Sequence, residues 1–296
     1  MPPDPMPPLG TRLAVGGRDL WFLRSGTGGP AVVFLSGAGA IGLDYLNVHE
    51  GAARNTTSVL YDRAGTGWSD PVELPRTARE VTSELRELLA AAGIPAPYLL
   101  VGHSLGGAYA RHYAQRFPHE VAGLLLLDPL HEDSSKYWPE EVRKSGEQMK
   151  NMPLPELPDA VLEAYRGLFE QKFRTWPDPV REALVARHLA GWRAGFLEGK
   201  NMEEVCEELR RGGATPEVPL TVMTAMAVDP AQPYMSETVQ REVNAGKHTL
   251  NALLAGSVRG GRHLVLGDAA HTWITMDRGD AVVEAIDDLL HRANER

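Results

Sequence analysis

The stretch YLLVGHSLGGAYARHYAQRF, residues 98–117, constrains the fold of this chain more than any other. An apolar run over residues 98–101 leads into the motif GHSLG at residues 102–106, and a helical pattern begins at once. A G-x-S-x-G motif of this kind presents its serine on a sharp turn between a strand and a helix. The helix start directs N–H groups at any oxygen that develops charge above the serine. The stretch therefore predicts that Ser104 is a nucleophile held by a parallel sheet.

Short apolar runs separated by helical patterns predict the rest of that sheet. A hairpin is expected over residues 11–26, with its turn at Gly16-Gly17. Continuous apolar runs, typical of strands buried on both faces, lie at residues 31–35 and 121–127, and further strands are expected at residues 58–62, 98–101, 218–224 and 263–266. Helical patterns follow several of these runs, and Thr77 to Glu80 form a capping box that opens one of the helices. The order indicates an α/β fold with a mostly parallel sheet and helices on both faces.

The character of the chain changes between residues 131 and 214. Prolines cluster there, strand-like runs are absent and amphipathic helical patterns dominate, one of them opened by a second apparent capping box at Asn201 to Glu204. We interpret residues 131–214 as a helical cap, or lid, inserted into a core formed by residues 11–130 and 215–296. The proline-rich residues 1–10 are expected to be a flexible tail.

Composition excludes several classes of function. The net charge of −9 argues against partners such as nucleic acid or an anionic membrane surface, which attract basic patches. No apolar run is long enough to predict a membrane span, and the first residues show no signal peptide pattern. The single cysteine, Cys206, excludes an internal disulfide and is compatible with a cytoplasmic location, which we expect. Nothing in the sequence indicates the oligomeric state.

Three further segments carry a resemblance to a known family. They are SGAGA at residues 36–40, YDRAGTGWSD at residues 61–70 and GDAAH at residues 267–271. Together with GHSLG they make the chain resemble the α/β-hydrolase fold family, in its serine-nucleophile, esterase- or lipase-like branch with a helical lid. The resemblance covers residues 11–292 and is weak in the lid. Members of this family carry nucleophile, acid and histidine in that chain order. It implies that His271, just after the last core strand, is the catalytic base.

The resemblance leaves two candidates for the acid that would orient His271. Family members most often supply the acid after the strand that follows the lid, where Asp229 stands. Others supply it at the end of the strand before the lid, which is Asp128. We favour Asp128 because it directly ends a buried strand at the carboxyl edge of the sheet, where ligand sites collect. Asp229 remains the alternative.

The resemblance also implies where an oxyanion would be held. One donor should be the backbone N–H of Leu105, just after the nucleophile, and the other the N–H of Ala38 in the SGAGA loop. Relatives usually carry His-Gly where this chain has Ser36-Gly37. That change preserves the backbone donor but requires different packing around the loop.

These features predict a serine hydrolase that needs no cofactor. The expected substrate is a small, apolar carboxylic ester, lactone or thioester, cleaved through an acyl-enzyme. The sequence contains no metal-binding motif and no dinucleotide-binding fingerprint. Two alternatives stay open: an acyltransferase or cyclase of a biosynthetic pathway, and a small-molecule receptor whose triad is idle. The natural substrate, its acyl chain length and the stereochemical preference are not indicated by the sequence.

Overall fold

The computed structural model describes residues 6–295, so the first five residues of the predicted tail lie outside it. Within this part of the chain, eight strands form one sheet in the order β1-β2-β4-β3-β5-β6-β7-β8. The strands β1 and β2 run antiparallel to their neighbours, and β3 to β8 are parallel. The strands are β1 (Thr11–Val15), β2 (Arg18–Ser25), β3 (Ala31–Leu35), β4 (Ser58–Tyr61), β5 (Tyr98–His103), β6 (Val121–Leu127), β7 (Leu220–Ala225) and β8 (Arg262–Leu266). The predicted α/β fold is confirmed.

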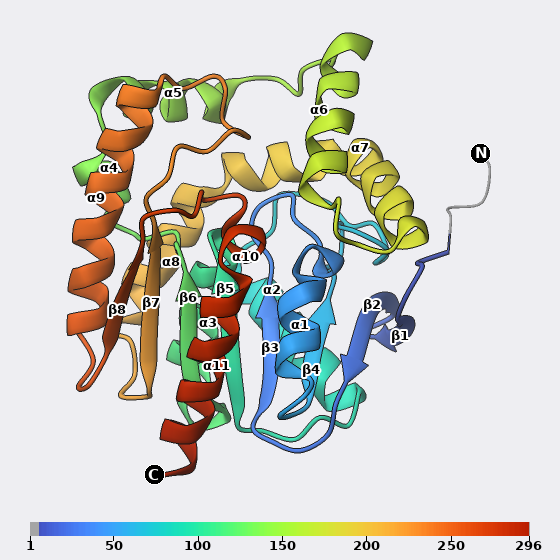
Figure 1. The fold of residues 1–296 in the computed structure, drawn as a ribbon, viewed down its shortest axis with the longest axis vertical. Helices are drawn as coiled ribbons and strands as arrows, with labels where there is room; N and C mark the ends of the chain where they lie inside the picture. The colour runs from blue at the N-terminus through green and yellow to red at the C-terminus, as the bar shows by residue number, and fades with distance from the viewer. Residues whose placement is uncertain (1–5, 296) are drawn as a thin grey trace.

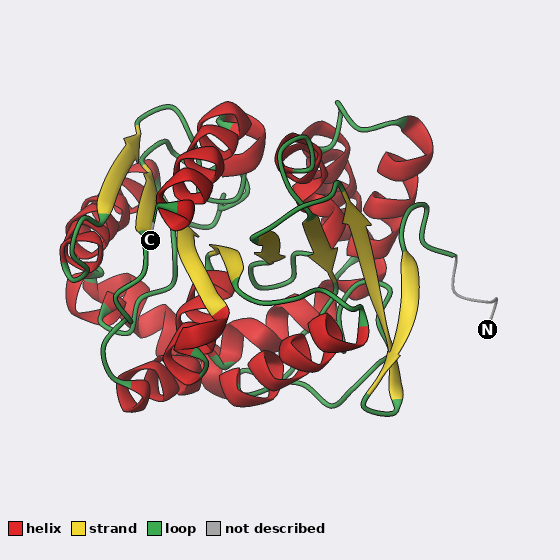
Figure 2. Cartoon of the chain, turned by 90° about the horizontal axis from the view of Figure 1, so that it is seen from below, coloured by secondary structure: helices red, strands yellow, loops and turns green. Residues whose placement is uncertain are grey.

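Alternating side chains of the strands pack into two separate cores. Val33 and Leu35 of β3 contact the core under α2 (Ala78–Ala91), α3 (Leu105–Arg116) and α9 (Glu237–Gly256). Their neighbours Val32 and Phe34 face the opposite core under α1 (Leu46–Ala52) and α11 (Gly279–Asn294). A period of two along a strand requires this division. Figure 2 shows the strands between the two helical layers.

The two capping boxes expected from the sequence have different outcomes. At Thr77 the box is complete: its hydroxyl accepts the N–H of Glu80, and the Glu80 carboxylate accepts the N–H of Thr77. The prediction of a capping box at Asn201 is wrong. Asn201 ends α7 and begins α8, and its side chain makes no cap hydrogen bond. Its amide donates instead to the carbonyl of Arg76 at 2.9 Å, so a tertiary contact displaces the local one.

The segment between β6 and β7 is helical, as expected. It contains α4 (Ser134–Tyr137), α5 (Glu140–Asn151), α6 (Asp159–Lys172), α7 (Asp178–Lys200) and α8 (Met202–Gly212). Figure 1 shows α6 and α7 lying across one end of the sheet. The buried side chains of α8, Val205, Cys206 and Leu209, belong to the same core as α3. Of the helices between β6 and β7, α8 is therefore part of the main core and not of a separate layer above the sheet.

A buried polar cluster anchors α6 and α7 to the sheet. His188 of α7 hydrogen-bonds Asp44 at 2.7 Å, and the ammonium of Lys172, at the end of α6, lies 3.5 Å from the same carboxylate. Burial by itself would raise the pKa of Asp44, but these two partners outweigh it and lower that pKa. Phe169 stacks on His188 with ring centroids 4.4 Å apart. The two helices are thereby held above the turn that follows β3.

Candidate active site

Ser104 occupies the strained turn that its motif predicts. Its φ of 52° lies in the left-handed region, which is costly for a residue other than glycine. The absence of a side chain at Gly106 lets α3 pack closely on β3 behind this turn, because a Cβ atom there would overlap the carbonyl group of Leu35. The backbone N–H of Ser104 donates to the carbonyl oxygen of Leu127 at 3.1 Å, which ties the turn to the end of β6. The side chain is thus presented at the carboxyl edge of the sheet.

Asp128 reaches the same place through the strand register. His103 of β5 pairs with Leu127 of β6, so the residues that follow these two strands are neighbours. Asp128 also has a positive φ, of 45°. Its backbone N–H donates to the carbonyl oxygen of Met223 in β7. Its side chain is fully buried. Two adjacent parallel strands therefore present Ser104 and Asp128 side by side.

His271 approaches from the loop after β8 and completes a hydrogen-bonded chain. Its Nε2 lies 3.1 Å from Ser104 Oγ, and its Nδ1 lies 2.6 Å from Asp128 Oδ2. A carboxylate only accepts, so Nδ1 carries the proton and Nε2 is free to accept one from the serine hydroxyl. The structure thus brings together the three residues predicted as nucleophile, base and favoured acid, in the order that a catalytic triad needs.

Asp229, the alternative acid, does not contact the His271 side chain. Its Oδ2 accepts the backbone N–H of Thr272 at 2.8 Å, and its Oδ1 accepts the N–H of Ala231 at 2.9 Å. Burial would raise the pKa of Asp229, but these hydrogen bonds outweigh it and lower that pKa. Asp229 therefore orders the backbone of the loop that carries His271, while Asp128 holds the imidazole.

The loop that carries Ala38 and the first residue of α3, Leu105, both lie next to Ser104. The SGAGA loop is close enough that a Cβ on Gly37 would sit 3.3 Å from Ser104 Cβ. Leu105 begins α3, so its N–H is one of the first-turn donors that a helix leaves unpaired. Within residues 6–295, neither the N–H of Leu105 nor that of Ala38 donates to another protein group. Both are available to an oxygen that gains charge above the serine.

A buried ion pair ties the SGAGA loop to α7. Arg63 and Glu198 are 1% and 5% exposed and lie 2.8 Å apart. Arg63 also donates to the carbonyls of Ser36 and Gly37, and Glu198 accepts the N–H of Gly39 at 2.8 Å. The backbone on both sides of Ala38 is thus fixed by one pair of charges.

His103 connects the same loop to His271. Its Nε2 lies 2.9 Å from the carbonyl of His271, so this nitrogen must donate, and its Nδ1 then accepts from the Tyr45 hydroxyl at 2.8 Å. The Tyr45 oxygen in turn accepts the N–H of Gly37. Burial is the main cause that lowers the pKa of His103 to about 3, so the ring is neutral at pH 7. The ring donates to the carbonyl of His271 and so holds the backbone of the predicted base.

Sequence reasoning missed four residues that shape this site: His103, Tyr45, Glu198 and Lys247. His103 stands next to the nucleophile but was assigned no role. Glu198 is one of several carboxylates on α7, and only its burial distinguishes it. Lys247 of α9 donates to Asp128 Oδ2 at 2.5 Å. No local pattern marks any of these contacts, because each partner comes from a distant part of the chain.

If the N–H of Ala38 holds an oxyanion, as the sequence predicts, Glu198→Gln should displace this loop and lower kcat about tenfold with little change in KM, because such donors act mainly in the transition state. It should also lower the melting temperature, since removing one partner of a buried pair leaves the other charge uncompensated. Ester hydrolysis kinetics and thermal unfolding measure the two effects. Glu182→Gln, an exposed carboxylate on the same helix, is the matched control. A rise in KM at unchanged kcat would contradict this role of Glu198.

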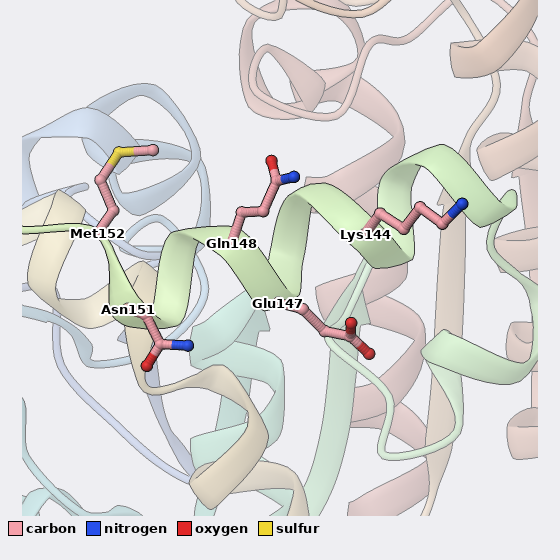
Figure 3. A pocket seen from close by; sticks show the side chains of 5 residues that line it. All are labelled: Lys144, Glu147, Gln148, Asn151 and Met152. Atoms are coloured by element: carbon pink, nitrogen blue, oxygen red, sulfur yellow. The ribbon is translucent and has the colours of Figure 1, made fainter.

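A shallow pocket elsewhere on the surface is unrelated to these residues. It is lined by Lys144, Glu147, Gln148, Asn151 and Met152. Figure 3 shows that these side chains project in different directions from α5 and its end. The pocket includes none of the predicted site residues, so it does not compete with the strand edge as the candidate site.

Comparison with known proteins decides the family. A family model described as the alpha/beta hydrolase family matches residues 32–285, most of the chain. The chain belongs to the alpha/beta hydrolase family. The match spans all three residues of the hydrogen-bonded chain, and the order of serine, aspartate and histidine is the one expected from the sequence. In residues 6–295 of this hydrolase-family protein, no helix combines the length and apolar character needed to cross a membrane.

Similarity to solved structures extends over almost all of this alpha/beta hydrolase, at low identity. A thermophilic esterase from Thermogutta terrifontis superposes with a TM-score of 0.66 at 19% identity, covering 96% of this chain and 98% of the other. The enol-lactonase from Burkholderia xenovorans LB400 superposes with a TM-score of 0.63, also at 19% identity, covering 95% and 100%. At this identity the two structures establish the shared fold.

Sequence similarity to curated relatives is more local. The uncharacterized protein YqjL of Bacillus subtilis is 35% identical over 124 residues, which are 41% of this chain and 49% of YqjL. The alignment thus covers less than half of that relative. The activity of this alpha/beta hydrolase family member therefore has to be argued from its own site.

Proposed function

We propose that this protein is a serine hydrolase that cleaves a carboxylic ester, lactone or thioester with a hydrophobic portion. The observation that carries the proposal is the chain of hydrogen bonds from Ser104 Oγ through His271 to Asp128. A serine hydroxyl becomes an effective nucleophile when a base removes its proton during attack, and the free Nε2 of His271 is placed to do so. An esterase and an enol-lactonase share the fold, which agrees with this class of substrate.

The proposed reaction has two stages. Ser104 Oγ bonds to the acyl carbon while its proton passes to His271 Nε2, and the N–H groups of Leu105 and Ala38 hold the oxyanion. The imidazolium then gives that proton to the leaving oxygen or sulfur as its bond to the acyl carbon breaks, leaving an acyl-enzyme. Water attacks this ester with His271 again as base. The bond from Ser104 Oγ to the acyl carbon then breaks as His271 returns the proton to Oγ, which releases the acid product and regenerates Ser104.

The inserted helices support an apolar substrate portion. An aromatic row runs from the buried end of α6 toward the surface: Phe173 stacks on His188, Phe169 stacks on both, and Tyr165 stacks on Phe169. Tyr165, at the outer end, is 40% exposed. The row begins next to Asp44, whose neighbour Tyr45 contacts His103. An acyl or alcohol group that extends from Ser104 toward α6 would meet aromatic surface, which favours hydrocarbon over charge.

Turnover of a nitrophenyl ester series from acetyl to dodecanoyl tests the proposal. We expect measurable hydrolysis by the folded wild type, with the best chain length reporting the size of the apolar site. A fluorophosphonate should label Ser104, identified by peptide mass. Transfer to an added alcohol in preference to water would favour the acyltransferase alternative. Ligand binding without turnover or labelling would favour the receptor alternative and contradict the proposal.

A further inference from the structure

Lys247 makes a contact with the candidate triad that the proposed reaction does not use. Its ammonium donates to Asp128 Oδ2 at 2.5 Å, and the same oxygen accepts Nδ1–H of His271 at 2.6 Å. The Lys247 side chain is 15% exposed and that of Asp128 is fully buried. Two charges in such a setting interact more strongly than an exposed pair, because solvent screens them less. The contact is therefore part of the electrostatic environment of the base.

The other oxygen of the carboxylate shows why the geometry depends on Lys247. Asp128 Oδ1 is buried and has no hydrogen-bond partner among the described residues. Both strong donors, Nζ of Lys247 and Nδ1 of His271, therefore bind Oδ2. A carboxylate held by one donor alone could rotate about its Cβ–Cγ bond. Two donors converging on one oxygen oppose this rotation and keep Oδ2 directed at the imidazole.

Charge provides a second argument. In a triad the acid stabilises the imidazolium that forms when the histidine takes the serine proton. Burial would raise the pKa of Asp128, but Lys247 and His271 outweigh it and hold that pKa well below its usual range. Asp128 is thus a carboxylate throughout the working pH range. Since Lys247 is positive, His271 faces an ion pair rather than an isolated negative charge.

The remaining groups around His271 do not replace that positive charge. His103, on β5, packs against the imidazole with ring centroids 5.0 Å apart and is neutral at pH 7. Asp229, after β7, binds the backbone of Thr272 and adds a second negative charge that interacts with His271. Lys172, at the end of α6, is paired with Asp44. Lys247, on α9, is the cation that contacts Asp128, and Asp128 in turn holds His271.

We propose that Lys247 is a positioning residue of this site, which orients the Asp128 carboxylate toward His271 and offsets its negative charge. The inference rests on the proposed function of Ser104, His271 and Asp128. Offsetting the carboxylate weakens its electrostatic stabilisation of a positive imidazole ring. The acid limb of the activity profile is therefore expected at lower pH than with an uncompensated aspartate.

The test is the pH dependence of fluorophosphonate labelling of Ser104, which needs no knowledge of the natural substrate. Lys247→Gln and Lys247→Met remove the charge, and Lys247→Arg retains it. We expect the midpoint of the acid limb to move to higher pH by about one pH unit in the two uncharged variants. Lys247→Arg should stay near the wild type. Lys144→Gln, an exposed lysine of α5, makes the same change in net charge far from the site.

The outcomes separate the inference from the proposed function. If Lys247 only stabilised the fold, its uncharged variants would melt earlier but label with an unshifted midpoint, and the inference would be overturned. Labelling requires a folded site, so the midpoint is read from the folded fraction even when a variant is unstable. If the wild type is not labelled, or is labelled at a residue other than Ser104, the proposed function itself fails.

Discussion

Replacing Ser104 with alanine is expected to lower kcat for ester hydrolysis by about 10⁶-fold. The hydroxyl is the only group in the hydrogen-bonded chain that can bond to an acyl carbon, since His271 Nε2 points at it and Asp128 is buried behind the imidazole. Some rate above that of water should remain, because the oxyanion donors and the binding surface are unchanged. Steady-state kinetics with the best nitrophenyl ester measures the loss.

Two controls make this result specific. Ser135→Ala, at an exposed serine of α4, should leave kcat unchanged. Ester binding to Ser104→Ala should persist, since alanine removes one atom and no wall of the site. Retention of full activity in Ser104→Ala would mean that another group performs the attack, and the serine hydrolase proposal would fall.

The second large effect is expected from Asp128→Asn, which should lower kcat by about 10⁴-fold. An amide in this position can present N–H to the ring and select the wrong imidazole tautomer, leaving no lone pair on Nε2 for the serine proton. The substitution also removes the charge that stabilises the imidazolium. Kinetics at a pH above the acid limb isolates this effect from simple protonation of His271.

Asp229→Asn is the matched control for the acid. Its amide oxygen can still accept the N–H of Thr272, but its amide nitrogen cannot accept that of Ala231, so the loop loses one anchor and kcat should fall by about tenfold. The paired substitutions thus distinguish the two aspartates that the sequence left open. A larger loss in Asp229→Asn than in Asp128→Asn would reverse their assignment.

Much of the fold could be predicted from local sequence. The apolar runs at residues 31–35 and 121–127 became β3 and β6 with the expected bounds, because a strand buried on both faces needs uninterrupted apolar residues. The run at 218–224 begins later, as β7 at Leu220, after a proline that has no N–H for the sheet. The complete capping box at Thr77 and the absent one at Asn201 mark the limit of local signals: the same pattern fails where a distant carbonyl competes.

In the candidate site, local sequence is sufficient to predict the position of the serine turn and the chain order of Ser104, Asp128 and His271. A motif of five residues with its strand and helix is sufficient for the first, since backbone geometry is encoded locally. Which aspartate contacts His271 follows from the packing of the sheet, because the choice depends on the neighbouring ends of β5 and β6. The contacts of Asp128 with His271 and Lys247 join residues 143 and 119 positions apart. No sequence pattern encodes such distances, and the packing of the whole sheet and its helices brings these charges together.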